Sequence, residues 1–256
     1  MYLPSVRLDN QVAIVTGAGK GIGRALAIGL AEAGADVALL ARTQDDLESV
    51  AFEIEKLGRT AYPIQVDMTK RIEIEQAVHS IIDRAGKIDI LVNNAGTNIR
   101  RNALEVTDEE WEKIIDTNLK SAYIMSQVVA HQMKERGRGK IINISSVDGH
   151  LAALSGVAYG ATKAALIQMT KIHAVEWAQY GIHVNAIGPY FFKTPLTEKV
   201  LADPVVLEEI IARTPMRRIG ELEDLVGPTV FLASNMSNYI TGQTLFVDGG
   251  MTIYGN

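Results

Sequence analysis

The sequence predicts an α/β fold in which a single doubly wound parallel sheet carries helices on both faces. Two observations predict it. Short runs rich in Val and Ile alternate along the chain with longer segments whose apolar residues recur at helical spacing. Right-handed strand–helix–strand connections then place successive strands parallel to one another in one sheet. Since no linker, repeat or low-complexity tract divides the 256 residues, we expect one domain over residues 1–256.

The elements follow one another in strand–helix order, each strand a short buried run and each helix a longer amphipathic one. The predicted strands, about seven, are Ala13–Thr16, Val37–Leu40, Ala61–Val66, Ile88–Val92, Lys140–Ile144, His183–Ile187 and Leu245–Val247. The predicted helices are Gly23–Ala33, Thr43–Leu57, Ile72–Arg84, Thr107–Arg136, Tyr159–Tyr180 and Leu222–Ala233. Thr107 and Glu110 have the spacing of a capping box at the start of the fourth helix. In such a sheet, ligands bind beyond the carboxyl ends of the strands.

The composition excludes several classes of function. The chain has no cysteine, which rules out disulfides, a thiolate nucleophile and Cys-ligated zinc, and we expect a cytoplasmic protein. Residues 1–10 lack the apolar core of a signal peptide, and no run of about 18 apolar residues predicts a membrane span. The net charge of -5, without long basic blocks, argues against a nucleic-acid partner. The five histidines have no metal-ligand spacing, so we expect no metal site.

A glycine-rich segment joins the first predicted strand to the first predicted helix: Thr16-Gly17-Ala18-Gly19-Lys20-Gly21-Ile22-Gly23. Glycines at this point let the backbone turn tightly and approach a pyrophosphate, which the N–H groups and dipole of the helix N-terminus would hold. A P-loop is excluded because Gly21, rather than Ser or Thr, follows Lys20. The segment therefore predicts a dinucleotide-binding site.

Further motifs follow this loop in a fixed order. They are Asn93-Asn94-Ala95-Gly96 after the fourth strand, Asn118, Ser146, Tyr159-Gly-Ala-Thr-Lys163 and Val247-Asp248-Gly249-Gly250 near the end. With the glycine loop, they resemble the short-chain dehydrogenase/reductase family, and the resemblance spans nearly the whole chain. It implies a Rossmann-like fold and an oxidoreductase that uses a nicotinamide dinucleotide.

The resemblance implies which residues hold the cofactor. They are Gly17, Gly19, Lys20, Gly21, Ile22, Gly23, Arg42, Thr43, Asp67, Met68, Asn94, Ala95, Gly96, Tyr159, Lys163, Pro189 and Thr194. An NAD site has an acid at the end of the second strand to bind the ribose 2′-hydroxyl, whereas this chain has Ala41 followed by Arg42. Arg42, with Lys20 as a second cation, suits a 2′-phosphate. NADP(H) is therefore favoured, and NAD(H) stays open.

Four residues are the candidate catalytic set: Asn118, Ser146, Tyr159 and Lys163. Tyr159 and Lys163 are four residues apart in a predicted helix, so they face the same way. A positive charge about 4 Å away would lower the pKa of a tyrosine from about 10 to about 7 at an effective dielectric near 20. By the resemblance, Ser146 polarises the substrate carbonyl, Lys163 also holds the ribose hydroxyls, and Asn118 holds a water beside Lys163.

The substrate end carries weaker signals. Candidate substrate residues are Arg100, Arg101, Ser146, His150, Tyr159 and Tyr190. Adjacent arginines could bind a carboxylate, or could instead pair with a helix acid such as Glu105. Tyr190 stands where the family usually has glycine, which adds an aromatic wall and should stiffen the loop. Residues 194–218 are the predicted substrate lid.

Asn98-Ile99-Arg100-Arg101, with Thr194-Pro195-Leu196-Thr197 and the C-terminal tail, resembles the gluconate 5-dehydrogenase and sugar-dehydrogenase subgroup. The expected substrate is thus a small molecule, a sugar or sugar acid. A 3-oxoacyl-carrier-protein reductase or other ketone reductase shares these motifs and stays open, as does a non-catalytic dinucleotide sensor. The resemblance also implies a homotetramer, with contacts from the fourth and fifth helices and from residues 242–256.

Overall fold

The computed structural model describes residues 2–153 and 155–254. It is built on one seven-stranded sheet with the order β3-β2-β1-β4-β5-β6-β7, and every neighbouring pair is parallel. The strands are β1 (Val12–Thr16), β2 (Asp36–Ala41), β3 (Ala61–Gln65), β4 (Ile90–Asn93), β5 (Gly139–Ile144), β6 (Ile182–Pro189) and β7 (Thr244–Val247). The predicted doubly wound α/β fold is confirmed.

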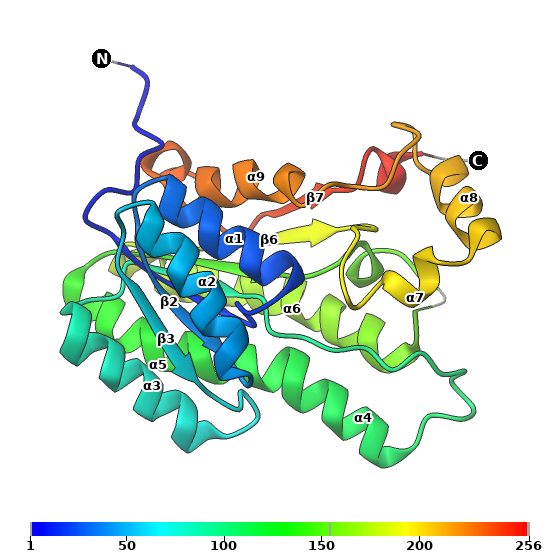
Figure 1. Ribbon diagram of the computed structural model, residues 1–256, viewed down its shortest axis with the longest axis horizontal. Helices are drawn as coiled ribbons and strands as arrows, with labels where there is room; N and C mark the ends of the chain where they lie inside the picture. The colour runs from blue at the N-terminus through cyan, green and yellow to red at the C-terminus, as the bar shows by residue number, and fades with distance from the viewer. Residues whose placement is uncertain (1, 154, 255–256) are drawn as a thin grey trace.

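Helices cover both faces of this sheet (Figure 1). They are α1 (Gly21–Glu32), α2 (Gln44–Lys56), α3 (Arg71–Ala85), α4 (Asp108–Ile115), α5 (Ser121–Arg136), α6 (Val157–Trp177), α7 (Glu198–Leu201), α8 (Pro204–Arg213) and α9 (Glu223–Ala233). One hydrophobic cluster packs α1, α2 and α9 against the sheet, and the other packs α3, α5 and α6. Alternate residues of β1 belong to opposite clusters, Ala13 to the first and Ile14 to the second, as a strand buried on both faces requires. No helix in the described ranges is long and apolar enough to span a membrane.

The predicted fourth helix is divided. Its capping box is present, with Thr107 Oγ1 accepting from the Glu110 N–H at 3.2 Å. After α4, a π-helical turn over Asp116–Lys120 interrupts the α-helix before α5 begins. Such turns widen the helix locally and occur often at functional sites. Asn118 lies in this turn.

The strand order places the ligand crevice. The order reverses at β1, which pairs with β2 on one side and β4 on the other, and both strands end at the same edge of the sheet. A crevice therefore opens beyond the carboxyl ends of β1 and β4. The predicted lid, residues 194–218, contains the helices α7 and α8, which lie together at one end of the molecule (Figure 1).

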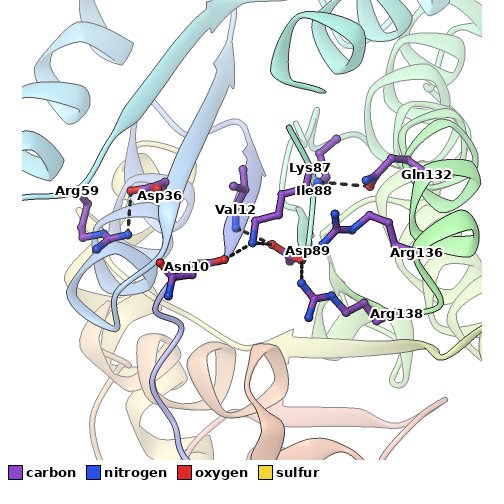
Figure 2. Close-up of polar contacts among 10 residues, drawn as sticks. All are labelled: Asn10, Val12, Asp36, Arg59, Lys87, Ile88, Asp89, Gln132, Arg136 and Arg138. Carbon is purple, nitrogen blue, oxygen red and sulfur yellow. Dashed lines mark hydrogen bonds and ion pairs between the residues drawn. The ribbon is translucent and has the colours of Figure 1, made fainter. Parts of the chain in front are cut away.

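An ionic cluster around Asp89 lies at the amino ends of the strands, opposite the crevice (Figure 2). Asp89 directly precedes β4. The Asp89 carboxylate, only 5% exposed, lies within 3.3 Å of Lys87 and accepts hydrogen bonds from Arg136 and Arg138. It also accepts a 3.0 Å hydrogen bond from the Val12 N–H. One buried acid thus anchors β1, β4 and the connection into β5.

Candidate active site

A cleft of about 570 Å³ lies beyond the carboxyl ends of β1, β2, β4, β5 and β6. Every residue predicted to hold the cofactor lines it, including the glycine loop, Pro189 and Thr194. Ser146, Tyr159, Lys163 and Tyr190 line it as well. The fold therefore brings together motifs that lie far apart in the sequence.

The glycine loop is shaped for a close backbone approach. Gly17 and Gly21 have φ values of +66° and +55°, which side-chain-bearing residues adopt rarely. A Cβ on Gly23 would lie 2.2 Å from the Gly17 carbonyl oxygen and 2.5 Å from the Asn94 Nδ2. Because α1 begins here without a side-chain cap, its first N–H groups remain open to a ligand. The loop and helix end fit a pyrophosphate.

Asn94 and Thr16 hold the ends of β1 and β4 together beneath this loop. The Asn94 side chain donates to the Thr16 carbonyl at 2.9 Å. In return, Thr16 Oγ1 accepts from the N–H groups of Asn94 and Ala95, both at 3.0 Å. These bonds explain why Asn-Asn-Ala-Gly follows β4: the amide fixes the loop that the glycines leave flexible.

Next to the glycine loop, the sequence after β2 presents cations to the cleft. Arg42 has its backbone carbonyl held by Gln65 at 2.7 Å, and no acid in the described ranges lies within ion-pair distance of its guanidinium. The second expected cation, Lys20, pairs with Asp46 at 3.0 Å. Asp67 accepts hydrogen bonds from the Thr69 N–H and hydroxyl, and these bonds lower the pKa of its carboxyl.

Tyr159 and Lys163 lie side by side in the first turns of α6. The Lys163 Nζ is 5.5 Å from the centre of the Tyr159 ring and donates to the Ile144 carbonyl at the end of β5, at 2.8 Å. Ser145 donates its hydroxyl to the Lys163 carbonyl, which occupies it, whereas Ser146 Oγ accepts a hydrogen bond from the Asp148 N–H at 3.2 Å. Ser146 is thus the serine whose hydroxyl proton is available to a substrate.

The pKa values of this pair differ from the expectation. Burial, aided by the charge of Asp148, raises the pKa of Tyr159 to about 12, and burial lowers the pKa of Lys163 to about 8. Desolvation is the largest influence on the pKa of Tyr159, and it acts against the lowering that the spacing of Tyr159 and Lys163 predicts. A hydrogen bond with Ser146 and the charge of Arg100 each lower the pKa of Tyr159, but they do not offset the effect of burial.

Asn118 lies behind the cleft rather than on its lining. It is buried in the π-helical turn, where its Oδ1 accepts from the Thr97 N–H at 2.8 Å and its Nδ2 donates to the Thr97 carbonyl at 2.9 Å. A longer bond of 3.4 Å reaches Thr162 in α6. Thr97 itself lines the cleft. Asn118 therefore connects the loop after β4 with the helix that carries Tyr159 and Lys163.

Three of the six candidate substrate residues do not line the cleft. Arg101 pairs with a helix acid, as the alternative interpretation held, and this acid is Glu110 of α4 at 3.0 Å. The Arg100 guanidinium lies 6.0 Å from the Phe191 ring, and that ring packs edge-on against Tyr190. His150 packs against Phe246, with 5.1 Å between ring centres.

Tyr190 does line the cleft, and its φ is not positive, so the tyrosine takes the place of the family's glycine without backbone strain. Burial raises the pKa of Tyr190. Ser146 and Tyr159 line the same cleft. Within the described residues, no group of three or more His, Cys, Asp or Glu is placed to hold a metal ion.

Sequence reasoning missed several lining residues: Asp46, Thr97, Lys113, Thr117, Phe192, Leu196 and Thr197. Lys113 and Thr117 face the cleft from α4 and the π-helical turn. Nothing in a local pattern distinguishes them from other polar residues of an amphipathic helix. Asp46 has the position of an ordinary acid in a first helical turn, and only the fold places it against Lys20.

Known proteins resemble the chain over nearly its full length. The family model described as enoyl-(acyl carrier protein) reductase matches residues 17–252. Gluconate 5-dehydrogenase of Gluconobacter oxydans is 40% identical over 96% of this chain and 96% of its own. A 3-oxoacyl-[acyl-carrier-protein] reductase of Staphylococcus epidermidis is 38% identical over 94% of this chain and 99% of its own.

The fold is matched as closely as the sequence. The crystal structure of a gluconate 5-dehydrogenase from Burkholderia cenocepacia, in complex with NADP and tartrate, superposes with a TM-score of 0.96. The two chains are 38% identical, and the match covers 100% of each.

Proposed function

Because the chain belongs to the short-chain dehydrogenase/reductase family, we propose that it transfers a hydride between NADP(H) and a secondary alcohol or carbonyl of a sugar or sugar acid such as gluconate. The observation that carries the proposal is the meeting of Ser146, Tyr159 and Lys163 at the end of the cleft opposite Arg42. Relatives named for gluconate oxidation support the substrate class. A dinucleotide sensor would not need this polar trio.

The chemistry divides between cofactor and chain. The bound nicotinamide supplies or accepts the hydride, while the side chains handle the proton. With a pKa of about 12, Tyr159 is protonated at neutral pH and gives its hydroxyl proton to the carbonyl oxygen during reduction. The Ser146 hydroxyl donates a hydrogen bond to the same oxygen and stabilises its developing charge. In the oxidative direction, Tyr159 must first lose its proton.

Lys163 favours the loss of the Tyr159 hydroxyl proton in the oxidative direction. Its ammonium beside the ring stabilises the tyrosinate, and its position at the cleft suits it to the ribose hydroxyls as well. Asn118 acts as a positioning residue, since both ends of its amide are engaged by Thr97. Its bonds fix the floor of the cleft beside α6. This role differs from the direct hold on a water that the family resemblance implies.

The cofactor assignment rests on the glycine loop and the region after β2. Gly17, Gly21 and the α1 N-terminus would hold the pyrophosphate, and Arg42 would bind the 2′-phosphate. Asp67 and Met68 would flank the adenine, while Pro189 and Thr194 would face the carboxamide. NADP complexes of structural relatives support this order of preference.

The substrate end favours an acid held by Arg100. Arg101 is already paired with Glu110, whereas Arg100 lies 6.0 Å from the Phe191 ring and its charge lowers the pKa of Tyr159. His150 packs beside Phe246. Segment 194–218, with α7 and α8, is the proposed lid over this end.

The test is a panel of gluconate, a neutral polyol of similar length and a β-ketoester, assayed at 340 nm with NADP(H) and NAD(H). Arg100→Ala should reduce kcat/KM for the sugar acid by about 10- to 150-fold, which corresponds to the loss of one charged hydrogen bond. The kcat/KM for the neutral polyol should stay nearly unchanged. Arg101→Ala is the matched control and should change neither. Equal effects on acidic and neutral substrates would contradict the sugar-acid assignment, and no turnover with any of them would contradict the proposed function.

A carrier-protein substrate is disfavoured by the position of the cations. A group of three basic side chains, Lys87, Arg136 and Arg138, surrounds Asp89 at the amino ends of the strands (Figure 2). An acidic carrier bound there would hold its acyl group at the edge opposite the cleft.

We further propose a cytoplasmic homotetramer, which the exposed apolar face of α6 supports.

A further inference from the structure

The cation end of the cleft contains an acid. Lys20 and Asp46 both line the cleft beside Arg42 and Thr43, and the Lys20 Nζ lies 3.0 Å from the Asp46 Oδ2. The two side chains differ in exposure: that of Lys20 is 63% exposed and that of Asp46 only 24%. The lysine can therefore move, while the carboxylate is held.

The fold fixes Asp46 from two sides. It belongs to the first turn of α2, where the helix dipole favours a negative charge. Its Cβ is so close to the glycine loop that a Cβ on Gly19 would lie 2.9 Å away from it. Any side chain at position 19 would push the α2 N-terminus off the loop. Gly19 thus allows the carboxylate to approach the place where Lys20 leaves the backbone.

We propose that Asp46 sets cofactor selectivity by competing with the 2′-phosphate of NADP(H) for Lys20. This inference rests on the proposed function, because it concerns the same cleft. A 2′-phosphate at Arg42 meets a second negative charge in Asp46, and it can recruit Lys20 only by breaking the existing ion pair. A cofactor with a free 2′-hydroxyl meets neither cost. The carboxylate therefore narrows the preference for NADP(H) that Arg42 creates.

The neighbouring residue provides a matched control. Asp45 lies in the same first turn of α2 and carries the same charge, but it is exposed and does not line the cleft. Asp45→Asn and Asp46→Asn remove the same charge from the same helix end. A difference between the two variants therefore reports the contact with Lys20 and not the dipole or the net charge.

The experiment is equilibrium binding of NADPH and NADH to the purified full chain, followed by nucleotide fluorescence at low and high salt. Asp46→Asn should tighten NADPH binding by about 3- to 10-fold at low salt, and by less at high salt, because one like charge near an exposed phosphate is removed and its effect is screened. NADH binding should change less than about 2-fold, and Asp45→Asn should change both nucleotides less than about 2-fold. In a Lys20→Met background, the effect of Asp46→Asn should be smaller, because only the direct repulsion between the carboxylate and the phosphate is then removed and no lysine is released to the phosphate.

Three results would overturn the inference. Weaker NADPH binding by Asp46→Asn would show that the carboxylate positions Lys20 for the phosphate instead of competing with it. No change, or an equal change in Asp45→Asn, would show that the contact does not matter. These outcomes leave the proposed function intact. A parent chain that binds neither nucleotide would overturn the proposed function, and this inference with it.

Discussion

His173 illustrates how burial makes a single residue sensitive to pH. Its ring is stacked on Trp177 with 4.0 Å between centres, and burial lowers the pKa of the imidazole to about 4. Its Nδ1 is buried and has no hydrogen-bond partner among the described residues. The unfolded chain binds this proton near pH 6.5, so it takes up more protons than the folded chain between pH 6.5 and 4. Stability must therefore fall as the pH drops through that window.

We expect His173→Phe, which keeps a ring for Trp177, to remove about 1–3 kcal/mol of the stability difference between pH 7 and pH 4.5. Urea unfolding at both values measures this difference. His131→Gln, an exposed histidine on α5, is the control and should leave the difference unchanged. If His173→Phe retains the full acid sensitivity of the parent chain, the loss must come from other groups.

Individual site residues were predictable only where chemistry or backbone geometry restricts the choice. Gly23 is such a position, because any Cβ would collide with the Gly17 carbonyl. Tyr159 and Lys163 are another, since their spacing alone places them on one helix face. Asp46 was not predictable, because its partner Lys20 belongs to a different strand–helix unit and the two meet only when the sheet is assembled. The pKa of Tyr159 was mispredicted because burial cannot be read from spacing.

Asp89 shows how one residue controls the assembly of several elements. Its carboxylate compensates Lys87, Arg136 and Arg138 and also accepts from the β1 backbone (Figure 2). Asp89→Asn keeps the size of the side chain but leaves these cations without an anion. Because Arg138 is 61% exposed, water offsets part of the loss, and we expect a decrease of about 2–4 kcal/mol in the free energy of unfolding.

Urea unfolding of Asp89→Asn measures this decrease, and Asp83→Asn, an exposed acid on α3, is the control with the same charge change. The cluster lies at the edge of the sheet opposite the cleft, so the KM for the cofactor should stay close to that of the parent. A loss of less than about 1 kcal/mol would show that the cations are satisfied by water alone.

Whole elements were predicted better than their interruptions. Strands of apolar residues and amphipathic helices follow from periodicity, and the predicted boundaries lie close to those observed. The π-helical turn at Asp116–Lys120 was missed, because the apolar pattern runs through it without a break. The helices α7 and α8 were missed as well: they are short, and their sequence lies in a segment that looks like a loop.

One face of α6 is exposed to solvent and packs against no other element among the described residues. The exposed residues of α6 are Val157, Ala161, Ala164, Gln168, Lys171, Ile172, Val175 and Glu176, and five of these eight are apolar. Val175 is 82% exposed. Tyr123 on α5 is exposed nearby, within 6.3 Å of the His173 ring on α6. A stripe of this kind is typical of a subunit contact.

We therefore expect a homotetramer in light scattering at micromolar concentration, with contacts from α5, α6 and residues 242–254. Positions 255 and 256 of the predicted contact segment lie outside the described residues. Ile172→Arg combined with Val175→Arg should lower the mass by disrupting this contact, whereas Ile72→Arg, an exposed apolar residue on α3, should not. A monomeric parent chain would contradict the proposed assembly.

We propose that Tyr159 transfers the proton in the cleft while other residues hold the cofactor. Tyr159→Phe separates these two roles when kcat and the Kd for NADPH are measured on the same preparation. We expect turnover to fall below a few per cent of the parent while NADPH binding stays within about 3-fold, because the lost hydroxyl serves chemistry and the phosphates are held elsewhere. Substantial turnover by Tyr159→Phe would remove this residue from the reaction.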